Sequence, residues 1–247
     1  MDALFAAMMQ DTALQKLQEY FNGKADENLA YGLSGSQKHV AFAAAFSRAP
    51  QPFVILVHNS EAVSEWREDL AALLPETEIV ELPELDIVSV QAEARSMERS
   101  ARRMDVLGRL MRKDPVIVLS TSAAAVQKGM SRNEFQRLSL SIRIGDELER
   151  EKLLGQLVQL GYEHADEVER VGQFSARGGI VDIYAINAQS PVRIEFFDDT
   201  VDSLRDFDLT TKRSIRNVST TTVLPLAQTD KAGRPELFLT YLEGNGV

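Results

Sequence analysis

Cysteine is absent from this chain of 247 residues, and histidine occurs only three times. Without a thiol the chain can form no disulfide, no thiolate metal site and no cysteine nucleophile, and this composition is typical of a reducing compartment. The three histidines are far apart in the sequence and show no metal-ligand spacing. We therefore expect no metal site.

Long apolar runs are missing as well. No stretch of about 18 consecutive apolar residues occurs, so we expect no membrane-spanning helix. The opening residues, MDALFAAMMQD, lack the basic start and the small-residue cleavage site of a secretory signal. A cytoplasmic location is the resulting expectation.

Positive charge is scarce relative to negative charge: 27 lysines and arginines stand against 37 aspartates and glutamates, a net charge of -10. Nucleic-acid binding draws most of its free energy from phosphates neutralised by lysine and arginine. An acidic chain is therefore a poor general DNA binder, although it can carry a local basic patch. A protein partner with a complementary surface fits this composition better.

The first half of the chain alternates between apolar runs and amphipathic segments, after one or two short helices in residues 1–23. The pattern predicts strands at 29–33, 53–57, 79–82 and 116–119, and helices at 36–48, 60–74 and 97–111. Uninterrupted runs such as FVILV at 53–57 are typical of buried parallel strands. We predict a doubly wound parallel α/β domain over residues 1–127.

The pattern changes in the second half. Alternating leucine and isoleucine predict a half-exposed strand at 138–144, and a helix is expected over 145–160 with Gly161 closing it. Only strands are predicted afterwards. One helix on a mostly antiparallel sheet indicates an α+β domain, which we place at 128–217, with 218–247 returning to the first domain.

A glycine-rich loop follows the first predicted strand. Gly32, Gly35 and Lys38 partly match the phosphate-binding pattern Gly-x-x-x-x-Gly-Lys-Ser/Thr. Gln37 stands where the second glycine of that pattern belongs, and His39 stands where the hydroxyl would meet magnesium. Two interpretations compete: weak ATP binding through Lys38, or a degenerate loop that only turns a strand into a helix. The second is preferred because a glutamine side chain obstructs close approach of the backbone to phosphate.

The segment 94–112 is rich in arginine. Its arginines are Arg95, Arg99, Arg102, Arg103, Arg109 and Arg112. They can form a basic strip for DNA, a solvated helix face paired with nearby acidic residues, or a docking face for another domain. The solvated face is the preferred interpretation.

Catalytic patterns are not found. The carboxylates between Asp182 and Asp208 are joined by no histidine or lysine in a recognisable arrangement, so a metal-dependent nuclease site is not indicated. No nucleophile elbow, zinc-binding helix pair or dinucleotide-binding glycine pattern occurs. We predict no catalytic residue in this chain.

A candidate recognition surface lies between Gly172 and Phe197. Alternation over 180–186 and 192–197 predicts two antiparallel strands, and Gly178-Gly179 predicts a tight bend. Phe174, Arg177, Arg193 and Glu195 supply an aromatic ring, two guanidiniums and a charge partner, the composition of an interaction hot spot. Intramolecular pairing along a strand face is the competing interpretation.

The run GQFSARGGIVDIY, followed by PVRIEFFDDTVDSLRDFD and KRSI, resembles the UvrB-like amino-terminal module of the transcription-repair coupling factors (Mfd) and the matching part of UvrB. The resemblance covers about residues 28–226. It implies that the small domain binds UvrA, with the family's F-x-x-R-G arginine at Arg177 and its R-x-E pair at Arg193 and Glu195. Phe174 also matches. His164 stands near the place where relatives often carry a further arginine.

The resemblance implies further that the first domain is a degenerate P-loop-type domain without nucleotide. The module would be non-catalytic, would need no cofactor, and would recruit UvrA to stalled RNA polymerase. In the full-length family protein, a DNA translocase using ATP and magnesium and an RNA-polymerase-binding domain lie elsewhere. An ATP-binding UvrB-type helicase fragment that engages damaged DNA is the alternative, and an intramolecular clamp that masks the second domain is a third possibility.

Overall fold

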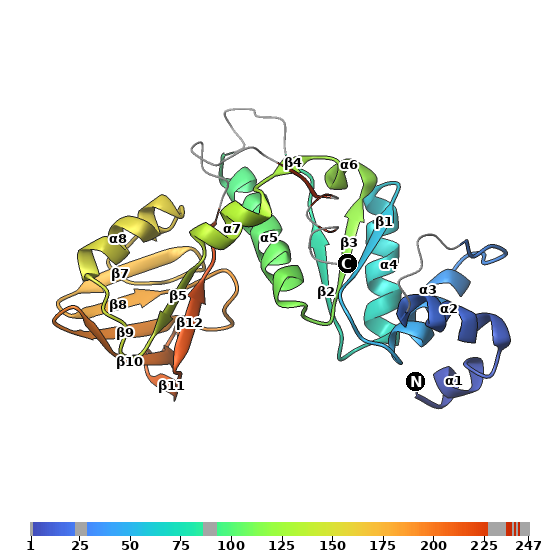
Figure 1. Ribbon diagram of the computed structural model, residues 1–247, viewed down its shortest axis with the longest axis horizontal. Helices are drawn as coiled ribbons and strands as arrows, with labels where there is room; N and C mark the ends of the chain where they lie inside the picture. The colour runs from blue at the N-terminus through green and yellow to red at the C-terminus, as the bar shows by residue number, and fades with distance from the viewer. Residues whose placement is uncertain are drawn as a thin grey trace. The chain divides into compact units, whose positions relative to one another are not determined.

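The computed structural model describes residues 2–22, 29–85, 93–226, 236–238, 240 and 242. The chain divides into two compact units: the first consists mainly of residues 1–84 and 109–126, and the second of residues 85–108 and 127–244 (Figure 1). Helix α5 (Glu93–Arg112) contributes residues to both. Among the described helices, none is long and apolar enough to cross a membrane.

The first unit contains a three-stranded parallel sheet with the order β1-β3-β2. These strands are β1 (Phe53–Val57), β2 (Glu78–Leu82) and β3 (Val116–Thr121). Every residue of β3 is buried, because it lies between the other two strands, whereas Leu56 of the edge strand β1 is partly exposed. The predicted parallel strands at 53–57, 79–82 and 116–119 are confirmed.

The helices of this unit share one core with the sheet, some packed on its strands and others on a neighbouring helix. They are α1 (Asp2–Met8), α2 (Thr12–Asn22), α3 (Gln37–Phe46), α4 (Ser60–Leu73), the end of α5, and α6 (Ser122–Ala125). The side chain of Asn59 accepts a hydrogen bond of 2.9 Å from the backbone N–H of Ala62, which fixes the start of α4. Phe46, Leu70 and Ile117 are among the residues of the shared core.

The predicted strand at 29–33 is wrong. Residues 29–34 form no strand, and Leu29 and Tyr31 are 85% and 87% exposed. A strand needs a neighbour for its backbone hydrogen bonds, and these residues have no strand partner in the described part of the sheet. The glycine loop is therefore not preceded by a strand of this sheet.

The second unit is built on a six-stranded sheet with the order β11-β10-β9-β8-β7-β6. The strands are β6 (Glu163–His164), β7 (Gln173–Arg177), β8 (Ile180–Ile183), β9 (Val192–Phe197), β10 (Thr200–Phe207) and β11 (Ser214–Asn217). Only β6 and β7 pair in parallel; the other neighbours are antiparallel, as predicted for this half of the chain.

Helix α8 (Arg150–Gln159) buries Leu153 and Leu157 in one core with Val181 and Ile194 of the sheet. It begins five residues later than the predicted start at Gly145. The segment before it is tied to the β9–β10 hairpin instead, through backbone bonds from Gly145 to Val201 (2.8 Å) and from Leu148 to Asp199 (2.7 Å). Gly161, at φ +92°, ends the helix as predicted.

Residues 218–226 belong to the second unit, so the predicted return to the first domain from residue 218 is wrong for this segment. Strand β12 (Thr220–Val223) pairs antiparallel with β5 (Leu140–Arg143). The Tyr162 hydroxyl donates a hydrogen bond of 2.9 Å to the carbonyl of Leu224, and burial raises the pKa of Tyr162, which keeps the phenol neutral. The short elements β4 (Lys128–Gly129), α7 (Arg132–Leu138) and β13 (Glu236–Leu237) complete the described unit.

Candidate protein-interaction site

The two faces of the six-stranded sheet have different compositions. Successive side chains of a strand point to opposite faces. One face carries buried apolar side chains such as Val181, Ile183, Ile194 and Leu204, which form the core with α8. The other, which we call the outer face, carries mostly charged and polar side chains.

The strand register places the outer-face residues in two rows. The first row is Ser175, Asp182, Arg193 and Arg205, and the second row is Arg177, Ile180, Glu195 and Ser203. Residues directly opposite each other on antiparallel strands lie close enough for their side chains to interact. Three of the predicted site residues, Arg177, Arg193 and Glu195, are therefore brought together on one face.

Arg193 is held in place by Asp182. Its Nε and Nη2 each donate a hydrogen bond of 2.7 Å to one carboxylate oxygen of Asp182. Its guanidinium carbon lies 4.9 Å from the ring centroid of Phe207, a cation–π geometry. The hydrogen bonds from Arg193 to Asp182 raise the pKa of Arg193, against the lowering effect of its partial burial. This guanidinium is thus a fixed positive charge in the floor of the site.

Glu195 is also engaged within the sheet. Its Oε2 accepts hydrogen bonds from the Ser203 hydroxyl (2.7 Å) and from Arg205 Nη2 (3.0 Å). The competing interpretation of intramolecular pairing therefore describes Arg193 and Glu195 well. Both side chains nevertheless remain partly exposed on the outer face.

Arg177 is the most accessible of the predicted arginines, with a side chain that is 62% exposed. Its Nη2 donates to the carbonyl of Asp166 (2.6 Å) and lies 3.1 Å from Glu167 Oε1. It ends strand β7 just before the turn at Gly178, which has φ +56°. At Gly179 a Cβ would come within 3.0 Å of the carbonyl oxygen of Phe196, so glycine permits the close packing of this turn against β9.

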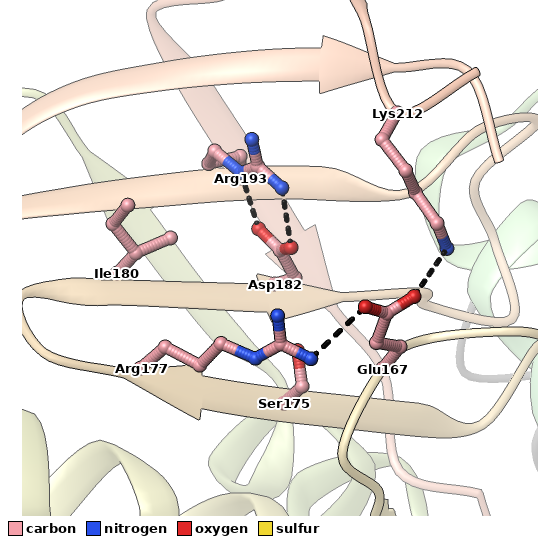
Figure 2. A pocket seen from close by; sticks show the side chains of 7 residues that line it. All are labelled: Glu167, Ser175, Arg177, Ile180, Asp182, Arg193 and Lys212. Atoms are coloured by element: carbon pink, nitrogen blue, oxygen red, sulfur yellow. Dashed lines mark hydrogen bonds and ion pairs between the residues drawn. The ribbon is translucent and has the colours of Figure 1, made fainter.

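A pocket of about 330 Å³ opens on this face (Figure 2). Its lining combines three cations, two carboxylates, a hydroxyl and an isoleucine: Glu167, Ser175, Arg177, Ile180, Asp182, Arg193 and Lys212. Figure 2 shows Asp182 directed to Arg193, and Glu167 placed between Arg177 and Lys212. Lys212 comes from the turn after β10 and was not foreseen from the sequence.

The aromatic member of the site is not the one predicted. Phe174 is 1% exposed and belongs to the core, so its role as a direct partner contact is wrong; its ring can only support the sheet from below. Phe197, by contrast, is 73% exposed and lies on the same face of β9 as Arg193 and Glu195, which precede it by four and two residues. The alternation along β9 was visible in the sequence, but it could not tell which face of the strand was covered.

His164 lies away from the pocket lining. It is exposed on the short edge strand β6, with its ring 5.1 Å from the ring of Phe174. Its parallel partner in the register is Phe174. A role of His164 in partner binding stays a prediction.

The glycine loop has its own internal contacts. Gln37 Oε1 accepts a hydrogen bond of 3.1 Å from the backbone N–H of Ser34, a donor that a phosphate loop leaves for its ligand. The Lys38 ammonium lies 5.8 Å from the centroid of the Trp66 ring. His39 is fully buried, with Nδ1 2.5 Å from Asp69 Oδ2. The contacts of Lys38 and His39 hold α3 against α4 within the first unit.

Three arginines of α5 form ion pairs. Arg102 is 2.7 Å from Glu98 Oε1, Arg109 pairs with Glu78, and Arg112 is 2.7 Å from Asp114 Oδ2. Arg103 is buried, which lowers its pKa to about 10. This arrangement favours the paired helix over a basic strip for DNA. The side chain of Arg95 lies outside the described residues.

No cluster of three or more histidine, aspartate or glutamate side chains suited to a metal ion occurs among the residues that the structure describes. Asp182, Glu195 and Asp206 pair with arginines, and Asp208 accepts hydrogen bonds within a turn. The described site offers paired charges and, at Phe197, an exposed aromatic ring.

Comparison with known families assigns the class of the second unit: residues 140–228 match the UvrB interaction domain. The chain is 34% identical over 200 residues to the transcription-repair-coupling factor of Bacillus subtilis (strain 168), which is 81% of this chain and 17% of that protein. It is 30% identical over 220 residues to the transcription-repair-coupling factor of Staphylococcus aureus (strain USA300), 88% of this chain and 18% of that protein.

The chain belongs to the transcription-repair coupling factor family, as its UvrB-like amino-terminal module. It spans about a sixth of the length of the curated relatives that it matches.

Proposed function

We propose that this chain is a non-catalytic interaction module that recruits the excision-repair protein UvrA to stalled RNA polymerase in the cytoplasm. The outer face of the six-stranded sheet, within the matched residues 140–228, is the docking surface. The observation that carries the proposal is an accessible arginine and an accessible phenylalanine, Arg177 and Phe197, on a sheet whose neighbouring Arg193 is held by Asp182.

Each part of this face has a distinct role in the proposal. Arg177 offers a planar fork for a carboxylate of UvrA, and Phe197 offers apolar area at the end of the same sheet. The Arg193–Asp182 pair does not need to break, because it sets the shape and charge of the pocket floor in the row of side chains next to Arg177. A rigid floor reduces the conformational entropy lost on binding.

The first unit supports the module without nucleotide in this proposal. Gln37 accepts a hydrogen bond from the backbone N–H of Ser34, and the Lys38 ammonium lies over the Trp66 ring. The N–H and the ammonium that a phosphate would need are therefore already in contact with other groups of the chain. ATP hydrolysis, DNA translocation and contact with RNA polymerase are assigned to the parts of the relatives that this chain does not span.

Calorimetric titration with purified UvrA tests the proposal. Wild type should bind, and Arg177→Ala and Phe197→Ala should each weaken binding about tenfold or more, the effect of removing a hot-spot side chain. Arg102→Ala is the matched control: it also removes an exposed arginine from a single acidic partner, but on helix α5 rather than on the sheet. Binding that is equal in wild type and in both surface variants would remove the site assignment.

A further inference from the structure

Glu167 places a carboxylate between two cations of the outer face. Its Oε1 lies 3.1 Å from Arg177 Nη2, and its Oε2 lies 4.0 Å from Lys212 Nζ (Figure 2). A docked partner would have to place a carboxylate where the Glu167 carboxylate now lies in order to contact Arg177 and Lys212. The chain thus supplies, from within, the chemical group that the surface is built to bind.

The contacts of Glu167 are those of an exchangeable side chain. Glu167 is 55% exposed, and its two ion pairs are single contacts at the surface. Exposed ion pairs of this kind contribute little to stability, since water screens them and both side chains lose conformational freedom. Asp182 differs: it holds Arg193 through two short hydrogen bonds and is mostly buried.

Removing Glu167 from its place would not leave the two cations disordered. Arg177 Nη2 also donates to the carbonyl of Asp166 (2.6 Å), and Lys212 Nζ donates to the carbonyl of Val168 (2.8 Å). Backbone acceptors on either side of Glu167 therefore keep both cations directed toward one point. A second carboxylate entering at that point would meet preorganised donors.

The charge balance of the pocket depends on Glu167. Arg193 is neutralised by Asp182, so Arg177 and Lys212 remain opposite the single charge of Glu167. With Glu167 turned away, the pocket would present two unneutralised cations in a chain whose net charge is -10. An acidic side chain is the partner group that this local excess favours.

We propose that Glu167 is an internal competitor for this pocket: an acidic side chain of the partner displaces it and takes over Arg177 and Lys212. This inference rests on the proposed function, because it names the chemistry by which the same face recognises UvrA. Glu167 then lowers the affinity of the module and restricts binding to partners whose carboxylate outcompetes it.

The test compares two neutralising substitutions of exposed glutamates. Glu167→Gln should bind UvrA about two- to fivefold more tightly than wild type, the range expected from releasing one exposed ion pair. Glu169→Gln makes the same change in net charge two residues away, outside the pocket lining, and should change affinity less. In an Arg177→Ala background the difference between the two substitutions should shrink, because Lys212 is then the one remaining pocket cation that Glu167→Gln releases.

Equal affinities of Glu167→Gln and Glu169→Gln in the wild-type background would overturn the inference. Failure of wild type and of all variants to bind UvrA would instead overturn the proposed function. A probe without UvrA separates the two cases: hexaglutamate should shift the side-chain Nε–H resonance of Arg177, more strongly in Glu167→Gln than in wild type, whereas hexalysine should not. Identical responses of the two proteins to hexaglutamate would exclude competition by Glu167.

Discussion

Arg177 and Arg193 lie on β7 and β9, the two strands that flank β8, and their side chains share one face of the sheet. Their surroundings set different roles. Arg193 is fixed by two hydrogen bonds to the mostly buried Asp182, whereas Arg177 is largely exposed and shares its Nη2 between a carbonyl and Glu167. Arg193 is therefore a structural part of the sheet, and Arg177 is available to a partner.

This difference predicts the effect of substitutions on stability. Arg193→Ala and Asp182→Ala should each lower the free energy of unfolding by about 1–3 kcal/mol, because each leaves the other group without its charged hydrogen bonds. The double variant should lose less than the sum of the two. Arg177→Ala, which breaks only exposed contacts, should cost less than about 1 kcal/mol. Urea unfolding measures all four, and strictly additive losses would show that the pair is not coupled.

At the scale of elements, the turn between β10 and β11 positions one of the pocket cations. Asp208 Oδ1 accepts hydrogen bonds from the backbone N–H of Thr211 (2.7 Å), from its hydroxyl (2.9 Å) and from the backbone N–H of Thr210 (3.1 Å). Lys212 follows at φ +57°, a conformation that the turn imposes. The turn thus carries Lys212 to the site.

The same turn should respond to acid. The hydrogen bonds from Thr211 and then Thr210 lower the pKa of Asp208 below its ordinary value of 3.8. A lowered pKa in the folded state means that Asp208 contributes stability above that ordinary value and loses the contribution as the pH falls through the folded pKa. Asp208→Asn should therefore lose less stability than wild type between neutral pH and pH values below 3.8.

Urea unfolding as a function of pH measures this difference. Asp202→Asn, which changes an exposed aspartate on β10 itself, serves as the control and should follow the wild-type curve. Parallel curves for wild type and Asp208→Asn would show that the turn does not depend on the Asp208 carboxylate.

At the scale of the whole molecule, the two units have separate cores, and the second contains the family match. The core of the first is built on a parallel sheet, and that of the second on one helix and a mostly antiparallel sheet. The match to the UvrB interaction domain begins at Leu140, inside the second unit. In the proposed function, recognition therefore belongs to the second unit, and the first unit has a supporting role.

This assignment predicts independence from Lys38. Lys38→Ala should bind UvrA with the affinity of wild type, within about twofold, because Lys38 contacts Trp66 within the first unit, whereas the proposed docking surface belongs to the second. Titration with ATP and magnesium should give no binding heat for either protein. Binding of ATP by wild type that is lost in Lys38→Ala would instead support the nucleotide-binding alternative.

The sequence by itself determined the local features of this protein. Apolar runs specified β1 and β3, Asn59 specified the start of α4, and Gly178-Gly179 specified the tight turn between β7 and β8. The alternation along β9 also placed Arg193 and Glu195 on one face. These features depend on backbone preferences and on periodicity within a few residues, and both are encoded in the local sequence.

The tertiary structure alone decided which segments pair and which face of the sheet is covered. Residues 29–33 are apolar but have no strand partner, whereas β12 finds its partner in β5, distant in the sequence. Because α8 covers one face, Phe174 is buried and Phe197 is exposed. The register across β7, β8 and β9 then decides that Arg193 meets Asp182 while Arg177 stays accessible, since partners in a sheet are set by long-range contacts rather than by local sequence.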